Sequence, residues 1–180
     1  MNITKPVILL TGSPGIGKST IIKKVSELVG HEAAGFYTRE VRKDELRVGF
    51  EIVTLDGERV LLAIKGGDIV FSNQVLFGSY KINLDAMEKI AVPKLREAAS
   101  SRKIIIVDEI GPMELFSKSF CQVITQILED NTITVIGTIV RRQYEFADWV
   151  KARPRVKTIE VSLENRDRLS AQIYSVIHRG

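Results

Sequence analysis

The sequence predicts an α/β fold, in which a parallel sheet is flanked by helices and carries an antiparallel hairpin insertion. Three observations on the 180-residue chain lead to this prediction. Apolar, β-branched runs of strand length alternate with amphipathic stretches of helical length, as in parallel sheets covered by helices. A glycine-rich segment joins the first run to the first amphipathic stretch, and an Asp-Gly pair separates two later strand-like runs. We expect a single domain over residues 1–180.

Five apolar runs are expected to form the parallel strands, and five amphipathic stretches are expected to form the helices. The strands are predicted at Val7–Thr11, 35–38, 103–107, 132–137 and 158–161, and the helices at Lys18–Val29, 84–100, 117–129, 144–150 and 165–177. Pro93 lies inside the second helix. It lacks an N–H donor and clashes with the preceding turn, so we expect it to kink or interrupt that helix.

One segment breaks the alternation of strands and helices. Residues 49–55 and 60–64 are strand-like and flank Asp56 and Gly57, a pair that favours a tight hairpin turn. Further strand-like pieces continue as far as Tyr80. We therefore expect a β-rich insertion at about residues 38–82.

The turn between the first strand and the first helix matches the phosphate-binding pattern G-x-x-x-x-G-K-[ST] (the P-loop). The expected nucleotide-binding residues are Gly12, Ser13, Pro14, Gly15, Ile16, Gly17, Lys18, Ser19 and Thr20. In such a turn, backbone N–H groups surround phosphate oxygens, and the positive end of the helix faces them. Lys18 is then expected to reach the β- and γ-phosphates as a catalytic cation, and the Ser19 hydroxyl to ligate Mg²⁺. The sequence therefore predicts binding of a nucleoside triphosphate with Mg²⁺.

An acidic pair follows the buried run at 103–107. The carboxyl end of such a strand is where open α/β sheets bind ligands. We expect Asp108 to hold Mg²⁺ through its waters and Glu109 to polarise an attacking water. Glu114, five residues further on, is a rival for the role of base because it could swing inward. A Gly-Pro turn at residues 111–112 is expected to fix where these carboxylates point.

A third set of candidates follows the strand at 132–137. Thr138 would lie close to the γ-phosphate if this strand neighbours the first strand. Arg141 and Arg142 follow it, and Arg142 is our candidate for the fixed positive charge that stabilises a phosphoryl transition state. The alternative is that both arginines are solvated or paired with Glu145 or Asp148.

The composition is that of an ordinary globular protein. The chain has 26 Lys and Arg against 22 Asp and Glu, which gives a net charge of +4. This balance suits a polyphosphate ligand and does not by itself indicate nucleic acid. The single cysteine, Cys121, is expected to be a packed thiol, and the two histidines lack metal-ligand spacing. The sequence has no membrane-length apolar run and no leader pattern, so we expect a cytoplasmic enzyme and take a monomer as the default.

Several motifs together resemble one known family, the cancer-related nucleoside triphosphatases, a group first associated with thermophiles. The resemblance covers essentially the whole chain and rests, beside the P-loop, on G-F-Y-T-R-E-V-R at 35–42, G-F-E at 49–51, V-D-E-I-G-P-M-E-L at 107–115 and N-R-D at 165–167. It implies a P-loop core of the RecA-like, additional-strand type. It also implies Mg²⁺-dependent hydrolysis of ATP, GTP and other nucleoside triphosphates such as CTP and UTP. By this resemblance Glu109 is the catalytic carboxylate, and segment 39–42 lies near the nucleotide. Pro112 stands where the family often has a polar residue, and it is expected to stiffen the turn.

Two other functions remain open at this stage. A nucleotide or nucleoside kinase is one, since the segment 153–155, Arg-Pro-Arg, could act as an arginine-bearing lid. A nucleic-acid-binding module is the other, supported only by basic clusters at 39–43, 141–142 and 151–157. The sequence has no guanine-reading N-K-x-D motif and no distinct acceptor motif. The acidic pair suits activation of water, so hydrolysis is the leading hypothesis.

Overall fold

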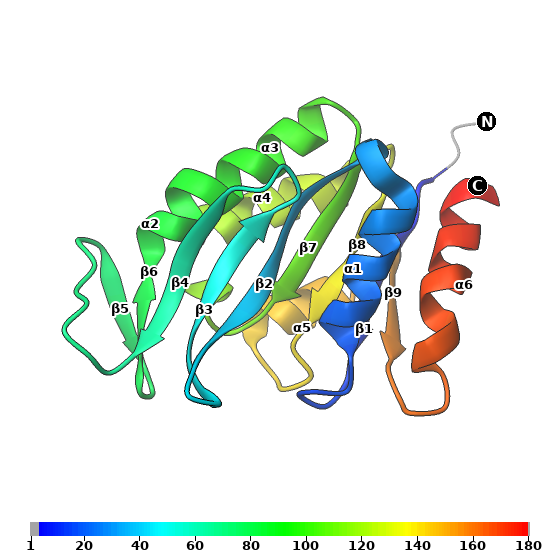
Figure 1. Ribbon diagram of the computed structural model, residues 1–180. Coiled ribbons are helices and arrows are strands. Elements are labelled where there is room, and N and C mark those ends of the chain that lie inside the picture. The colour runs from blue at the N-terminus through cyan, green and yellow to red at the C-terminus, as the bar shows by residue number, and fades with distance from the viewer. Residues whose placement is uncertain (1–3, 180) are drawn as a thin grey trace.

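A single mixed sheet organises the molecule. The computed structural model describes residues 4–179, and within them nine strands form one sheet in the order β5-β6-β4-β3-β2-β7-β8-β1-β9 (Figure 1). Strands β2, β7, β8, β1 and β9 are parallel to their neighbours in that part of the sheet. The predicted α/β fold with a parallel core is confirmed.

In the parallel half of the sheet, the P-loop strand β1 is separated from β7 by an additional strand, β8. Its members are β1 (Val7–Thr11), β2 (Ala33–Lys43), β7 (Ile104–Ile110), β8 (Val135–Ile139) and β9 (Val156–Glu160). Strand β8 separates β1 from β7, with Leu10 opposite Thr138. Strand β2 lies on the other side of β7, with Tyr37 opposite Asp108. The carboxyl ends of β1, β8 and β7 therefore meet along one edge of the sheet.

The insertion extends this sheet with antiparallel strands. These are β3 (Leu46–Thr54), β4 (Arg59–Lys65), β5 (Gln74–Phe77) and β6 (Tyr80–Asn83). Strands β3 and β4 pair around the turn that contains Asp56 and Gly57, and Gly57 has a φ of 97°. The hairpin predicted there is confirmed. Strand β2 is much longer than the predicted 35–38, because its second half pairs with β3.

Helices cover the two faces of the sheet unequally. On one face lie α1 (Lys18–Val29) and α6 (Arg166–Arg179), and on the other lie α2 (Leu84–Ala86), α3 (Val92–Ser100), α4 (Lys118–Glu129) and α5 (Glu145–Lys151) (Figure 1). Two short 3₁₀ helices, η1 (Gly30–Glu32) and η3 (Glu114–Phe116), lie between these elements. In Figure 1, α1 and α6 lie over the β1 end of the sheet, and β3 to β6 carry no helix on that face. This is the arrangement expected of antiparallel strands, which can leave one face to water.

The interruption expected at Pro93 takes the form of a π-helical segment. Residues 84–100 are helical throughout, but η2 (Met87–Ala91) has π-type hydrogen bonding, and Pro93 stands in the first turn of the helix that follows. Proline cannot donate to the preceding turn, and a π-turn is one way in which a helix accommodates such a break. The helix predicted at 117–129 begins one residue later, because Ser117 is its cap and accepts a 2.9 Å hydrogen bond from the N–H of Phe120.

Burial on both faces of the sheet explains why the sequences of the parallel strands are continuous apolar runs. Val7, Ile8, Leu9 and Leu10 are at most 2% exposed, since helices pack on both faces of β1. Full burial of such side chains contributes about 1.5–3 kcal/mol each. Among residues 4–179, no helix is long and apolar enough to cross a membrane.

Candidate active site

The P-loop has the backbone geometry that its glycines allow. It runs from the end of β1 to the start of α1, and Gly12, Gly15 and Gly17 have φ values of 142°, 76° and 110°. Such values favour glycine because it has no Cβ. At Gly12 a Cβ would also lie only 3.0 Å from the carbonyl oxygen of Val161. The sequence motif is therefore matched by a left-handed turn at the amino end of a helix.

Most side chains of this loop face solvent, and the Lys18 side chain folds back onto the loop. Its ammonium group donates to the carbonyl oxygens of Gly12 and Ser13, at 3.1 and 3.2 Å. Ser19 and Thr20 are exposed in the first turn of α1, and so are Ser13, Pro14 and Gly15 in the loop. Ile16 alone packs partly against the core beneath α1. The structure thus brings all the predicted loop residues together at one exposed helix terminus.

Asp108 lies at the centre of the site. It is 1% exposed, and its Oδ1 accepts a 2.5 Å hydrogen bond from the Thr138 hydroxyl. Within the described residues, its buried Oδ2 has no hydrogen-bond partner. Burial raises the pKa of this carboxyl, while hydrogen bonds from Thr138 and Ser19 and the charge of Lys18 lower it. A buried carboxylate oxygen without a donor is suited to a cation or its waters.

Glu109 lies next to Asp108 and partly faces solvent. Its carboxyl group packs against Gly111, where a Cβ would come within 2.9 Å of the Glu109 Cδ and Oε2 atoms. Burial and the neighbouring Asp108 raise the pKa of Glu109, and Lys18 lowers it. Gly111 therefore lies where it limits the position of the Glu109 carboxyl group.

Glu114 is held inside the protein. It is 4% exposed at the start of η3, where the backbone of Glu114 and Gly111 lowers the pKa of its carboxyl group. Burial first, and then the charge of Glu109, raises its pKa to about 8. At neutral pH this carboxyl is therefore mostly protonated. Sequence reasoning named Glu114 as a rival base, but its burial depends on the packing of η3 and could not be seen in the motif.

The two arginines after β8 differ in their surroundings. Arg141 forms an ion pair with Glu160 at the end of β9, with an N–O distance of 3.4 Å. Arg142 is exposed and makes no ion pair within residues 4–179. The alternative, that the arginines are solvated or paired with Glu145 or Asp148, holds in part. Arg142 is exposed, whereas Arg141 pairs with Glu160, and Asp148 pairs with Lys151.

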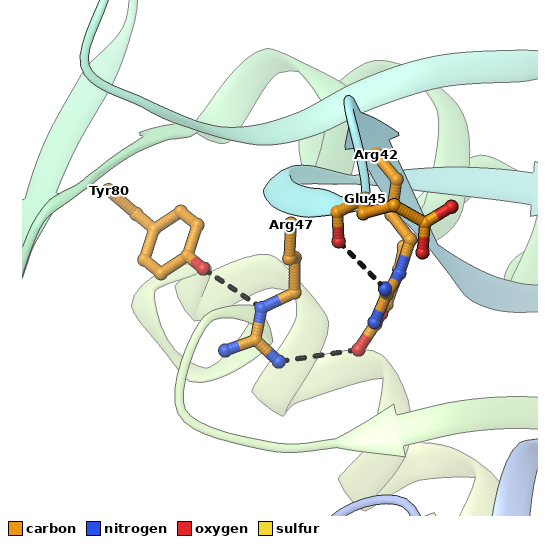
Figure 2. A network of polar contacts seen from close by, with 5 residues as sticks. Arg42, Glu45, Arg47 and Tyr80 are labelled. Carbon is orange, nitrogen blue, oxygen red and sulfur yellow. Dashed lines mark hydrogen bonds and ion pairs between the residues drawn. The ribbon is translucent and has the colours of Figure 1, made fainter.

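The charged segment 39–42 forms a network with the strands beside it. Glu40 accepts from Arg42 and Arg47, and Arg42 also donates to the carbonyl oxygen of Glu45 (Figure 2). Arg47 donates to the hydroxyl of Tyr80 at 3.1 Å. These groups lie at the tip of the β2–β3 hairpin and on β6, so they hold the insertion together. The motif alone gave no sign of these partners.

The proposed arginine lid is wrong, because residues 153–155 are bound to the opposite edge of the sheet. Arg155 donates to the carbonyl oxygens of Lys5, Leu128, Asp130 and Ile133, near the amino ends of the strands. Arg153 stacks on the ring of Trp149. Neither side chain is therefore free to close over the P-loop.

A second groove on the molecule is separate from the P-loop. A groove of about 600 Å³ lies between α1, β2 and the β3–β4 turn, and none of residues 12–20 lines it. Its charges are mixed, with Lys94 paired to Asp56. Among the described residues, no three His, Cys, Asp or Glu side chains gather as a metal site. Cys121 is half-buried on α4, and burial raises the pKa of its thiol.

Comparisons with known proteins agree with this geometry. A family model described as NTPase matches residues 7–174. The nucleoside triphosphatase THEP1 of Aquifex aeolicus is 40% identical over 180 residues, covering 96% of this chain and 99% of that protein. The cancer-related nucleoside triphosphatase of Homo sapiens is 36% identical over 181 residues, with 94% and 95% covered.

Two solved structures have the same fold. The crystal structure of THEP1 from Aquifex aeolicus superposes with a TM-score of 0.86 at 38% identity, over 96% of this chain and 99% of that one. The solution structure of a human cancer-related nucleoside triphosphatase gives 0.80 at 35% identity, over 98% of each chain. The additional-strand arrangement described above is thus shared with structures of these proteins.

Proposed function

Because this chain belongs to the nucleoside-triphosphatase family that includes THEP1 and the cancer-related nucleoside triphosphatases, we propose that it hydrolyses nucleoside triphosphates to the diphosphate and phosphate with Mg²⁺ and little selection for the base. Hydrolysis of a nucleoside triphosphate follows from membership of the family. The dependence on Mg²⁺, the breadth of substrates and the roles of individual residues are our proposals. A cytoplasmic location is proposed with them.

One observation carries the proposal: beside an exposed P-loop, the buried Oδ2 of Asp108 has no hydrogen-bond partner among residues 4–179. Ser19 and Asp108 supply the hydroxyl and carboxylate oxygens with which Mg²⁺ is held in P-loop enzymes, and Ser19 lies near enough to Asp108 to lower its pKa. These donors fit a hard cation. When bound, Mg²⁺ would neutralise charge that develops on the β- and γ-phosphate oxygens.

The catalytic roles follow from charge and protonation. Lys18 is proposed to leave the carbonyl oxygens of Gly12 and Ser13 and to bind the β- and γ-phosphates. Glu109 is proposed to accept a proton from the attacking water, whose oxygen forms a bond to the γ-phosphorus as the bond to the leaving diphosphate oxygen breaks. Glu114 is unsuited to this task, since its raised pKa leaves it protonated at neutral pH. Thr138 is proposed to orient Asp108.

Arg142 is proposed to contribute positive charge to the phosphoryl transition state. It follows β8, whose carboxyl end lies between those of β1 and β7, and within the described residues no acidic side chain holds it. Arg141 is less suited because Glu160 already pairs with it. A fixed arginine can stabilise the charge on a transferring phosphoryl group.

The proposed base selectivity and partners follow from the groups that are present at the site. The binding energy is assigned mainly to the phosphates and Mg²⁺, so ATP, GTP, CTP and UTP are all expected as substrates. We expect their kcat/KM values to lie within roughly a hundredfold of one another, which is about 2.7 kcal/mol. Nucleic acid as a partner has no support beyond the basic clusters, and a monomer stays our default.

Phosphate release tests the proposal directly. Each triphosphate is incubated with the purified chain, with and without Mg²⁺ and with and without a panel of nucleoside and nucleotide acceptors. We expect Mg²⁺-dependent release of phosphate without any acceptor. Release that requires an acceptor would replace hydrolysis by phosphoryl transfer, and discrimination of many thousandfold between ATP and GTP would overturn the proposed breadth.

A further inference from the structure

Apart from Lys18 in the P-loop itself, the groups proposed to act on the γ-phosphate lie on one side of the P-loop strand. Asp108 and Glu109 are on β7 and Thr138 is on β8, whereas β9 borders β1 on its other side. A triphosphate chain bound along the P-loop with its γ-phosphate toward β7 must direct its nucleoside away from β7. The nucleoside therefore leaves the P-loop on the side of β9.

The segment that follows β9 is attached to the P-loop. The N–H of Val161 donates a 2.8 Å hydrogen bond to the carbonyl oxygen of Thr11, the residue before Gly12. The carbonyl oxygen of Val161 lies against Gly12 so closely that a Cβ there would be 3.0 Å away. The loop 161–165 and the start of the P-loop thus form one packed unit.

The side chain of Asn165 fixes the shape of this loop. Its Oδ1 accepts a 2.9 Å hydrogen bond from the N–H of Ser162, and its Nδ2 donates a 2.9 Å bond to the carbonyl oxygen of Glu160. Helix α6 begins directly afterwards at Arg166. The loop is therefore ordered before any nucleotide arrives, which reduces the entropy lost on binding.

This ordered loop exposes a large apolar side chain. Leu163 is 67% exposed, although Val161 two residues earlier is 4% exposed and belongs to the core. A single exposed leucine is ordinary on a protein surface. Here its position matters, because it lies on a rigid loop on the side of β1 where the nucleoside must lie.

We propose that the loop 161–165 is the nucleoside subsite of this enzyme and that Leu163 packs against the face of the nucleobase. This inference rests on the proposed function, because it assumes that the γ-phosphate lies toward β7. Every nucleobase has an apolar face, whereas its edge differs from base to base. A site that contacts the face with a leucine accepts purines and pyrimidines alike, which is a physical basis for broad substrate use.

The test compares ligands that share phosphates and differ in the nucleoside. Calorimetry measures the binding of ADP and of pyrophosphate, each with Mg²⁺, to the full chain and to Leu163→Ala. We expect the Kd of ADP to rise about tenfold, equal to about 1.4 kcal/mol, and the Kd of pyrophosphate to stay the same. Leu28→Ala is the matched control, since Leu28 is 52% exposed at the far end of α1.

A second variant tests the loop independently of its apolar contact. Asn165→Ala removes both hydrogen bonds that shape the loop, so it should also weaken the binding of ADP more than the binding of pyrophosphate. Equal changes for the two ligands, or none in either variant, would overturn the subsite. The two proposals fail separately. If Leu163→Ala binds ADP unchanged and hydrolysis is normal, only the subsite is rejected. If Leu163→Ala weakens the binding of ADP but not of pyrophosphate, and the chain hydrolyses no triphosphate, only the hydrolase is rejected.

Discussion

The Thr138 hydroxyl donates a 2.5 Å hydrogen bond to Oδ1 of Asp108, from β8 to the neighbouring strand β7. This contact joins residues 30 positions apart in the chain. It occupies one carboxylate oxygen and leaves the buried Oδ2 without a partner among the described residues. The bond therefore sets the direction in which Asp108 offers its remaining oxygen.

Thr138→Val is expected to impair the use of Mg²⁺. The valine keeps the shape of the side chain but removes a hydrogen bond to a charged group, which is worth about 1.5–3 kcal/mol. The apparent affinity for Mg²⁺ in hydrolysis assays should fall by about tenfold or more. Thr125→Val on α4 is a suitable control, because the Thr125 hydroxyl donates to a carbonyl of its own helix, that of Cys121. An unchanged Mg²⁺ titration for Thr138→Val would show that Asp108 needs no such support.

Lys18→Ala is expected to abolish turnover while the protein stays folded. The Lys18 ammonium group donates to the loop carbonyls of Gly12 and Ser13, and we expect its loss to cost little stability. Without a cation spanning the β- and γ-phosphates, the rate should fall by roughly a thousandfold or more. Phosphate release and circular dichroism check the two parts. Lys24→Ala, on the same helix, should hydrolyse ATP normally, and near-normal hydrolysis by Lys18→Ala would contradict the phosphate-site assignment.

Substitutions in the acidic pair should give different kinetic results. Asp108→Asn should weaken apparent Mg²⁺ affinity together with the rate. Glu109→Gln keeps the size of the side chain and removes the base, so it should bind the triphosphate and Mg²⁺ almost normally and turn over at least about a hundredfold more slowly. Nucleotide titration and single-turnover hydrolysis measure both effects. Normal hydrolysis by Glu109→Gln with an inactive Glu114→Gln would mean that Glu114 is the base.

The buried carboxyl of Glu114 should make stability depend on pH. Its pKa is about 8 in the folded protein and near 4.5 when unfolded, so the folded state binds more protons between these values. The free energy of unfolding should therefore decrease as pH rises through this window, by at most about 1.4 kcal/mol per pH unit from this group. Glu114→Gln mimics the protonated side chain and should reduce this slope. Urea unfolding of both proteins at several pH values between 5 and 8.5 measures the difference, and identical slopes would contradict the assignment.

Local signals in the sequence predicted the elements that depend on local geometry. The bounds of β1 and α1 agree with the prediction, because a buried run, three glycines and an amphipathic stretch define a strand–turn–helix without help from the rest of the chain. The position of Asp108 near the carboxyl end of β7 was also predictable from such a pattern, and its role in the site stays a prediction. Its partner Thr138 could be named only on condition that β8 neighbours β1, and the sheet meets that condition.

Features that depend on tertiary packing were missed. Nothing in the motif at 107–115 indicates that η3 buries Glu114. The second half of β2 was not predicted as a strand, because the sequence does not show that residues 39–43 pair with β3 or that Arg39 meets Glu51 there. Arg155 was assigned to a lid from composition, whereas its acceptors come from residues 5, 128, 130 and 133. Such contacts follow from the path of the whole chain.

The position of Arg155 has a consequence for the stability of this protein. Its four carbonyl acceptors lie near the amino ends of the strands, at the edge opposite the P-loop. The four hydrogen bonds of this one side chain are therefore separated from the proposed chemistry by the length of the sheet. Substitutions of Arg155 are therefore expected to change the stability of the protein without altering any residue at the P-loop edge.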